Sequence, residues 1–476
     1  MFVFYHKVMK SKIISFLATV LIFGNSVFFA YTQSDEGKSE SESEEKVSVK
    51  DVALAAGVAF TVNVFFNWAD RIILDEDYAA VNLRTIKKNL TSAWWWDIDN
   101  FETNQFGHPY QGSLYFNAGR ANGLNFWQSL VIAGFGSLTW EECGETDSPS
   151  INDIITTPMC GAIFGESFHR LYIDAAELCP ALAWLLSPMD GLNRVLTGKN
   201  LKASGHTEEI DLLFHGGTEC SKTDFSDSSD SDGLKKFAGG GAIHIQYGEA
   251  IAHATKEPFD LFTVDVDTAF SAYFYKVDFD IDGFLWSTPL YFEESEATFG
   301  VNLMYEGEWA SNAVFSNAAT GVKFLYESRF FDSDGRFSFF AQIDGIFMGT
   351  RSIYSLYKNR ADYEDWEEPP RFYNFGGGVL AKFGFSLEDS RLGTFYAETS
   401  ADFLMPFTGS QVGQVKAEKN FMAKAKIGYE HKITDGFSLG LSDSLSYKAD
   451  WYKNQSDVAQ IMNSAQLYGK VAFKRK

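Results

Sequence analysis

The spacing of hydrophobic and polar positions in this chain changes near residue 205. Before that point apolar residues recur every three or four positions, which is the spacing of helices joined by turns. After it, apolar and polar residues alternate, as in Phe395–Leu404 and again in Ala465–Phe473. The pattern predicts an α+β chain, with a helical domain over residues 51–205 and a β-region over residues 206–476.

The β-region has the features of an antiparallel transmembrane barrel. We count about twelve candidate strands, many of them roughly 9–12 residues long, whereas strands of globular proteins average about 5–6. Asp-Gly pairs at 282–283, 334–335 and 435–436 are typical of tight hairpin turns. Aromatic residues make up 16% of the chain and it has 10 Pro, which also suits such a barrel. The alternative is a soluble β-sandwich or a lectin-like oligomer.

The N-terminus indicates an exported protein. Lysines within the first twelve residues precede an apolar stretch that ends near Ala30, which predicts a signal peptide over residues 1–30. An uncleaved membrane anchor is the alternative. Residues 31–50 are rich in Ser and Glu and are expected to form a disordered acidic tether. The apolar run 52–68 is short for a membrane span of about 20 residues, so we expect a helix packed against the rest of the protein. A barrel with this leader belongs in the outer membrane of a double-membraned bacterium, where lipid is its partner.

Composition limits the partners and the redox chemistry. The net charge of −23 argues against nucleic acid, because phosphate binding requires a basic surface. None of the cysteines forms a Cys-x-x-Cys pair, so neither a zinc ribbon nor a redox motif is supported. Pairing among Cys143, Cys160, Cys179 and Cys220 stays open, and composition assigns no cofactor.

The most unusual segment runs from Asn100 to Arg170. It combines His, Asp, Glu and Arg residues with stretches that otherwise have the apolar pattern of core helices. Burial of an unpaired charge costs several kcal/mol, so the segment must hold either a satisfied polar network or a functional site. It also carries Gly112 and Gly119 on the face of His108, which permits close approach of another helix.

The same segment contains a series of motif blocks in a fixed order. They are WD-D-F-TNQF-HPY-GSLYF-A-R, then GSL-WE--GE, then PSINDII-T and finally GE--HR. These blocks resemble an uncharacterised bacterial family, domain of unknown function 3943. The resemblance extends over Asp97–Arg170 and implies no known activity, so the chemical hypotheses below rest on the residues themselves.

The first hypothesis is a structural polar network. Glu141 and Glu145 share a helix face with Ser137 near the helix C-terminus, where the helix dipole disfavours anions. Arg120 and Arg170 are the expected counter-ions. The full predicted network is Asn104, Arg120, Glu141, Glu166, His169 and Arg170. In this hypothesis the network holds the helical domain as a plug in the barrel or beneath it, the role is structural or transport-related, and a small molecule or lipid is the ligand of the barrel.

The second hypothesis is a metal site. Glu166 and His169 form a Glu-x-x-His pair, the spacing with which helix bundles present a carboxylate and an imidazole to one metal. His108, Glu141 and Glu145 would complete a nitrogen and oxygen set suited to zinc, iron or manganese. A local hydrogen bond explains the same pair without a metal.

The third hypothesis is a membrane-embedded enzyme, a hydrolase or acyltransferase on envelope lipids. His108 would act with Glu145 or Asp153 as base and orienting carboxylate, and Ser113 or Ser137 would be the nucleophile. The chain lacks the Gly-x-Ser-x-Gly motif of common lipases. A soluble periplasmic binding module is the remaining alternative, and it requires that the barrel prediction fail.

Overall fold

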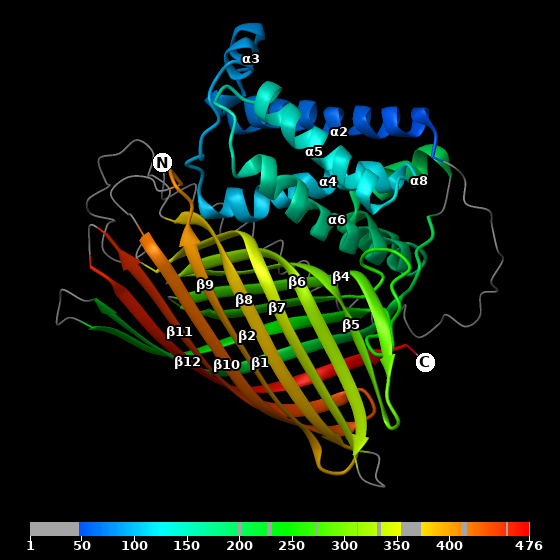
Figure 1. The fold of residues 1–476 in the computed structure, drawn as a ribbon, viewed down its shortest axis with the longest axis vertical. Helices are drawn as coiled ribbons and strands as arrows, with labels where there is room; N and C mark the ends of the chain where they lie inside the picture. Colours follow the sequence, from blue (N-terminus) through cyan, green and yellow to red (C-terminus); the bar gives the residue numbers. More distant parts are fainter. Residues whose placement is uncertain are drawn as a thin grey trace.

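The computed structural model describes residues 47–198, 201–225, 231–272, 274–311, 313–330, 335–353, 373–410, 417–453 and 456–475. The predicted signal peptide and nearly all of the predicted tether lie outside these residues. The described chain has a helical domain followed by a β-barrel (Figure 1).

Helices occupy the first part of the described chain. They are α2 (Val49–Ala69), η2 (Asp70–Leu74), η3 (Asp77–Ala79), α3 (Leu83–Asn89), η4 (Thr103–Gly107), α4 (His108–Ala121), α5 (Phe126–Cys143), α6 (Asp153–Leu178), α7 (Pro180–Leu186) and α8 (Pro188–Thr197). Ser48 caps α2 in a capping box with Asp51, so the helix begins two residues inside the predicted tether. The π-helical turn η2 extends α2 to Leu74. The predicted helical domain is confirmed.

Twelve antiparallel strands close into a barrel in which β1 pairs with β12. They are β1 (Thr207–Phe225), β2 (Ser231–Tyr247), β3 (Phe262–Ser271), β4 (Phe274–Tyr291), β5 (Ser295–Ala310), β6 (Val314–Phe330), β7 (Gly335–Ser352), β8 (Asn374–Asp389), β9 (Gly393–Pro406), β10 (Ala417–Thr434), β11 (Phe437–Tyr452) and β12 (Val458–Lys474). The barrel and its strand number are confirmed. Most strands are longer than predicted, with 19 residues in β1, while β3 with 10 residues has the predicted length.

The structure contains some of the predicted hairpin turns but not all of them. Gly436 lies between β10 and β11 with φ +89°, as a tight turn requires. Gly335 begins β7. The turn predicted at Asp282-Gly283 is wrong, because Gly283 lies inside β4 and pairs with Phe262. A Cβ at Gly283 would come within 2.4 Å of the Phe259 ring, so the glycine serves packing there and does not form a turn.

Ion pairs between strands that are not neighbours identify the inside of the barrel. Lys382 of β8 lies 2.8 Å from Glu306 of β5 and also pairs with Asp280 of β4. Lys424 of β10 lies 3.4 Å from Glu308 of β5. Because these strands are separated by two or more others, the pairs must cross the lumen. The charged positions of β4 and β5 therefore face inward, and the residues that alternate with them face outward.

The outward positions form an apolar belt. Side chains that are exposed there include Phe214, Phe237, Val379, Ile427, Leu441 and Leu467. In β4 and β5, by contrast, many outward residues are buried, among them Phe279, Tyr305 and Trp309.

The helical domain covers this buried part of the outer wall. Phe164 of α6 packs on Tyr305 with ring centroids 5.5 Å apart, and Phe106 of η4 packs on Phe279 at 4.9 Å. Helix α6 contacts β4, β5 and β6, and Figure 1 shows the helices stacked on one side of the barrel. The prediction that this domain plugs the lumen or lies beneath the barrel is therefore wrong, because its contacts are with side chains that point away from the lumen.

The two ends of the barrel differ in their connections. At one end β8–β9 and β10–β11 are joined by a few residues, and β1 begins and β12 ends there. We call this the turn end. At the other end, which we call the loop end, the connections from β7 to β8 and from β9 to β10 are long, whereas the β2–β3 connection over residues 248–261 is a long connection at the turn end. Short turns face the periplasm and long loops face outward in outer-membrane barrels.

Glycines allow the helices to pack closely, as the sequence predicts. A Cβ at Gly112 of α4 would lie 1.9 Å from the Thr157 carbonyl oxygen of α6, and a Cβ at Gly161 would lie 2.4 Å from the carbonyl carbon of Gly112. Gly119 similarly meets Ser129 of α5. Backbone contact at these points fixes α4 between α5 and α6.

Candidate functional site

An acidic cluster lies at the end of the helical domain near the loop end of the barrel. We call it the acidic centre, and its members are Asp97, Asp99, His108, Glu141, Glu145 and Asp153. The residues come from three separate segments, namely the chain around η4, the end of α5 with the following loop, and the start of α6. His108 is at the point where they meet, with its Nε2 atom 3.7 Å from Asp153 Oδ1 and 3.8 Å from Asp99 Oδ2.

Asparagine and serine side chains hold this arrangement in place. Asn152 Nδ2 donates to Asp153 Oδ1 at 2.9 Å and to Asn104 Oδ1 at 3.1 Å. Asn104 Nδ2 in turn donates to Asp97 Oδ1 at 2.8 Å and to the Tyr373 hydroxyl at the barrel rim. The centre is therefore anchored to the barrel through Asn104, a residue of the predicted network.

Carboxyl groups outnumber basic groups at the acidic centre. Among the described residues, His108 supplies the positive charge within ion-pair distance of its carboxylates. Glu141 Oε2 is stabilised instead by the backbone N–H of Ser150, which donates at 2.6 Å. Burial raises the pKa of Glu145 well above its ordinary value, and the charges of Glu141 and Asp99 raise it further. Such a centre can hold and release protons.

The predicted metal set is not assembled. Glu166 and His169 lie about four turns along α6 from the acidic centre, so they do not share a ligand position with His108, Glu141 and Glu145. One smaller group does have suitable geometry. Ligand atoms of Asp97, Asp99 and His108 lie within 4.8 Å of one another, and one face of the group is open because Asp99 is exposed. This nitrogen and oxygen set suits a divalent cation.

The arginines pair elsewhere. Arg120 Nε and Arg170 Nε each lie 2.8 Å from a different oxygen of Glu166, whose side chain is fully buried. Arg170 also reaches Glu257, at 3.1 Å, and the carbonyl of Pro258 in the β2–β3 connection. The expectation that Arg120 and Arg170 neutralise Glu141 and Glu145 is wrong, because both arginines lie at the turn end while those carboxylates lie at the loop end.

We call Arg120, Glu166, Arg170 and Glu257 the arginine network. It ties α4 and α6 to the turn end of the barrel. His169 belongs beside it, with Nδ1 at 3.0 Å from both carboxylate oxygens of Asp190. Ser187 donates to the same Asp190 at 2.6 Å, so His169 and Ser187 share one acceptor and do not form a base and nucleophile pair.

The two candidate nucleophiles contact backbone carbonyls. Ser113 Oγ donates to the Tyr110 carbonyl at 2.6 Å, and Ser137 Oγ donates to the Asp153 carbonyl at 3.1 Å. Both hydroxyls are buried. These contacts are typical of structural serines. A reaction at His108 would therefore use a water molecule or a substrate hydroxyl as its nucleophile.

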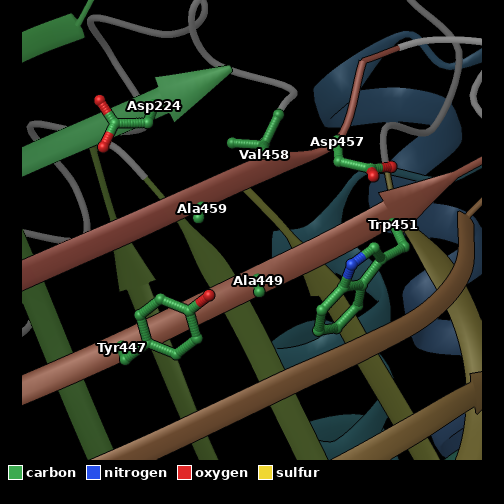
Figure 2. Close-up of a pocket in the computed structure, with 7 residues that line it drawn as sticks. All are labelled: Asp224, Tyr447, Ala449, Trp451, Asp457, Val458 and Ala459. Carbon is green, nitrogen blue, oxygen red and sulfur yellow. The ribbon is translucent and has the colours of Figure 1, made fainter. Parts of the chain in front are cut away.

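A separate pocket lies on the barrel at its loop end (Figure 2). Its lining residues are Asp224, Tyr447, Ala449, Trp451, Asp457, Val458 and Ala459, from the ends of β1, β11 and β12. None of the predicted site residues lines it.

Comparison with known proteins identifies the helical segment. Residues 93–177 match the model of a domain of unknown function, DUF3943. The matched segment contains every member of the acidic centre and three of the four members of the arginine network. The sequence-based resemblance is confirmed, and the acidic centre and most of the arginine network are built from DUF3943 residues.

Curated proteins give no match to the chain. Solved structures with similar shape include the NanC porin, with 8% identity, a TM-score of 0.27 and coverage of 53% of this chain and 98% of that one. A Pseudomonas aeruginosa FadL homologue has 8% identity, a TM-score of 0.26 and coverage of 56% and 90%. The β domain of the Bordetella autotransporter BrkA has 10% identity, a TM-score of 0.27 and coverage of 56% and 99%. The barrel itself is defined by the strand pairing of this chain.

Proposed function

We propose that this chain is an outer-membrane protein of a double-membraned bacterium, in which the barrel serves as a membrane anchor for the DUF3943 segment. The observation that supports this most directly is the two-faced barrel wall. Apolar side chains such as Phe237, Val379 and Leu467 are exposed on its outside, while its lumen carries the ion pairs. An apolar belt outside and a polar interior are the pattern of a barrel whose solvent is lipid.

The lumen argues for anchoring over free passage of solutes. Glu308 of β5 pairs with Lys448 of β11 and with Lys424 of β10, and all three charges lie between opposite walls. These pairs bridge the lumen, so an open pore at this level would require them to separate. The helical domain, held on the outer wall, is then the part that carries a specific function.

Gel mobility of protein extracted from outer membranes tests the anchor proposal. A closed barrel resists SDS until it is boiled, so we expect a band that shifts on heating and that fractionates with outer membranes. Recovery of the protein in the soluble exported fraction, without a heat-dependent shift, would contradict the proposal and support a soluble binding module.

A second candidate function is acid–base chemistry on an envelope lipid at the acidic centre. The observation that favours it is the convergence of two motif blocks, because His108 Nε2 lies within 4 Å of Asp99 of its own block and of Asp153 of a later block. Two carboxylates around one imidazole stabilise its protonated form. His108 would therefore donate a proton to a leaving group, and a neighbouring carboxylate would accept one from the attacking water or hydroxyl.

We expect His108→Asn and Glu145→Gln to leave a heat-modifiable barrel and to abolish a change in envelope lipids that the wild-type protein produces. Mass spectrometry of lipids from cells that express each variant measures this. Glu177→Gln, on the exposed face of α6, is the matched control and should behave as wild type. Loss of folded protein in the first two variants would instead assign the acidic centre a structural role.

A further inference from the structure

The helical domain turns a second apolar face away from the barrel. Exposed apolar side chains of α2 and α5 make up this surface, which we call the outer helix face; it includes Val52, Phe60, Val64, Phe65, Trp127, Val131 and Phe135. Val64 is 54% exposed and Val131 is 71% exposed. Soluble proteins rarely leave so many large apolar side chains together in water.

Helix α2 contributes most of this face. Together with η2 it forms a 26-residue helix, and it is the one described helix that is long and apolar enough to cross a membrane. Only 22% of its most apolar window is buried. The buried positions include the small residues Ala55 and Ala59, which face the bundle. The sequence predicts that this helix packs against the rest of the protein, and only one narrow side of α2 does so.

Four helices run between the two ends of the barrel in alternating directions. At the loop end, Asn67 near the end of α2 donates to the Gly144 carbonyl after α5, and Asn104 before α4 bonds Asn152 before α6. At the turn end, Phe126 at the start of α5 stacks on Phe259 of the β2–β3 connection. The order is thus α2 toward the loop end, α4 back, α5 toward the loop end and α6 back, which returns the chain to the end where β1 begins.

The helix lengths match the apolar belt of an outer-membrane barrel. At about 1.5 Å per residue, the 26 residues of α2 and η2 extend about 39 Å and the 18 residues of α5 about 27 Å. The apolar band of such barrels is about 25 Å tall. Charged residues of these two helices are confined to their ends, such as Lys50 and Asp51 in α2 and Glu141 in α5.

The buried amide of Asn63 in α2 is fully paired, as a lipid environment requires. Asn63 of α2 donates to the Gly136 carbonyl and to Thr139 of α5, and its amide oxygen accepts from Tyr115 of α4. Unpaired polar groups would cost several kcal/mol each in hydrocarbon. The tryptophans of the 94–96 run lie at the loop end, where Trp96 stacks on Phe375 and Phe407 of the barrel rim, a position typical of a membrane interface.

We infer that lipid acyl chains cover the outer helix face, so that α2, α4, α5 and α6 lie within the bilayer as a helical bundle beside the barrel. The surface that lipid contacts then passes without interruption from the strands onto α2 and α5. This inference rests on the proposed outer-membrane location. It also places the acidic centre at the loop end of the bundle, at the boundary between lipid and water.

Fluorescent probes on single cysteines test this inference in the full chain reconstituted into vesicles. Cys143, Cys179 and Cys220 are replaced by Ser, buried Cys160 is retained, and bimane is attached to Val64→Cys, Val131→Cys, Leu467→Cys or Leu83→Cys. Leu467 reports on the barrel belt, and exposed Leu83 of α3, beside Arg84 and Lys87, reports on water. Each variant must first show the heat-dependent gel shift.

We expect nitroxide groups on lipid acyl chains to quench bimane at positions 64 and 131 within about two-fold of position 467, whereas iodide quenches position 83. Iodide quenching at 64 and 131, with lipid quenching only at 467, would overturn the inference and leave the barrel in the membrane. Protection of 64 and 131 from both quenchers would assign the face to another protein surface, such as a second copy, and would also overturn it. Iodide quenching at 467 would instead contradict the outer-membrane location itself.

Discussion

Glu166→Ala should loosen the packing of α4 on α6 by about 3–5 kcal/mol. The substitution leaves Arg120 and Arg170 without their shared carboxylate, and Arg170 is fully buried. Loss of one partner from a buried ion pair costs about this much, because the remaining charge has no compensating interaction. Arg170 keeps Glu257 and the Pro258 carbonyl, so the effect falls mainly on the junction of α4 with α6.

The thiol of Cys160 measures this loosening directly. Cys160 lies in α6 with no exposed surface, so it reacts with a maleimide only when the domain opens. With the other three cysteines replaced by Ser, we expect labelling of Glu166→Ala to be faster on the order of a hundred-fold or more, since every 1.4 kcal/mol is tenfold. Glu177→Ala, an exposed position on the same helix, should label at the wild-type rate. Equal rates in both variants would show that Glu166 contributes little to the packing of α4 on α6.

The barrel could be predicted from sequence because each strand carries its own evidence. In a strand such as Phe395–Leu404, successive side chains alternate between the outside of the barrel and the lumen. This alternation can be recognised in each strand without knowledge of the rest of the fold. The turn at Asp435-Gly436 is likewise a local preference. Asp282-Gly283 has the same letters, but there the ring of Phe259 requires a glycine, and this ring comes from another part of the chain.

The position of the helical domain could not be predicted in the same way. Phe279 and Tyr305 alternate with inward charges, and an outward aromatic residue has the same pattern whether lipid or a helix covers it. The covering side chains, Phe106 and Phe164, have the pattern of ordinary core residues of helices. The sequence therefore separates inside from outside but does not show which part of the outside is occupied.

Sequence analysis names most residues of the acidic centre, but it does not show which candidate residues lie together. His108, Glu145 and Asp153 of the enzyme hypothesis lie in one cluster with Glu141 of the network and metal hypotheses, while Asp97 and Asp99 join them from a segment that the chemical hypotheses left out. Glu166 and His169 were grouped with them only because spacing suggested a shared ligand. Helix α6 has 26 residues, so its start lies at the acidic centre while Glu166 and His169 lie about four turns away.

In the lumen of the barrel, Glu308→Ala should both destabilise the barrel and raise its ion conductance. Glu308 is fully buried and pairs with Lys448 and Lys424 from the opposite wall. Its removal leaves Lys448, which is also buried, without its carboxylate, so we expect a loss of about 3–5 kcal/mol. The unpaired ammonium would draw water and anions into the lumen, because a buried charge without a partner recruits solvent.

Recordings across planar lipid bilayers and the temperature of the heat-dependent gel shift measure these two effects. Wild-type protein should conduct weakly, since its lumen is bridged, and Glu308→Ala should conduct more and unfold at a lower temperature. Glu388→Ala removes an equal charge from an exposed pair with Arg336 near the turn end and should change neither quantity, because exposed ion pairs contribute about 1 kcal/mol or less. Wild-type conductance already as large as that of Glu308→Ala would mean that the lumen is open despite its ion pairs, and the barrel would then have to be regarded as a channel and not as an anchor.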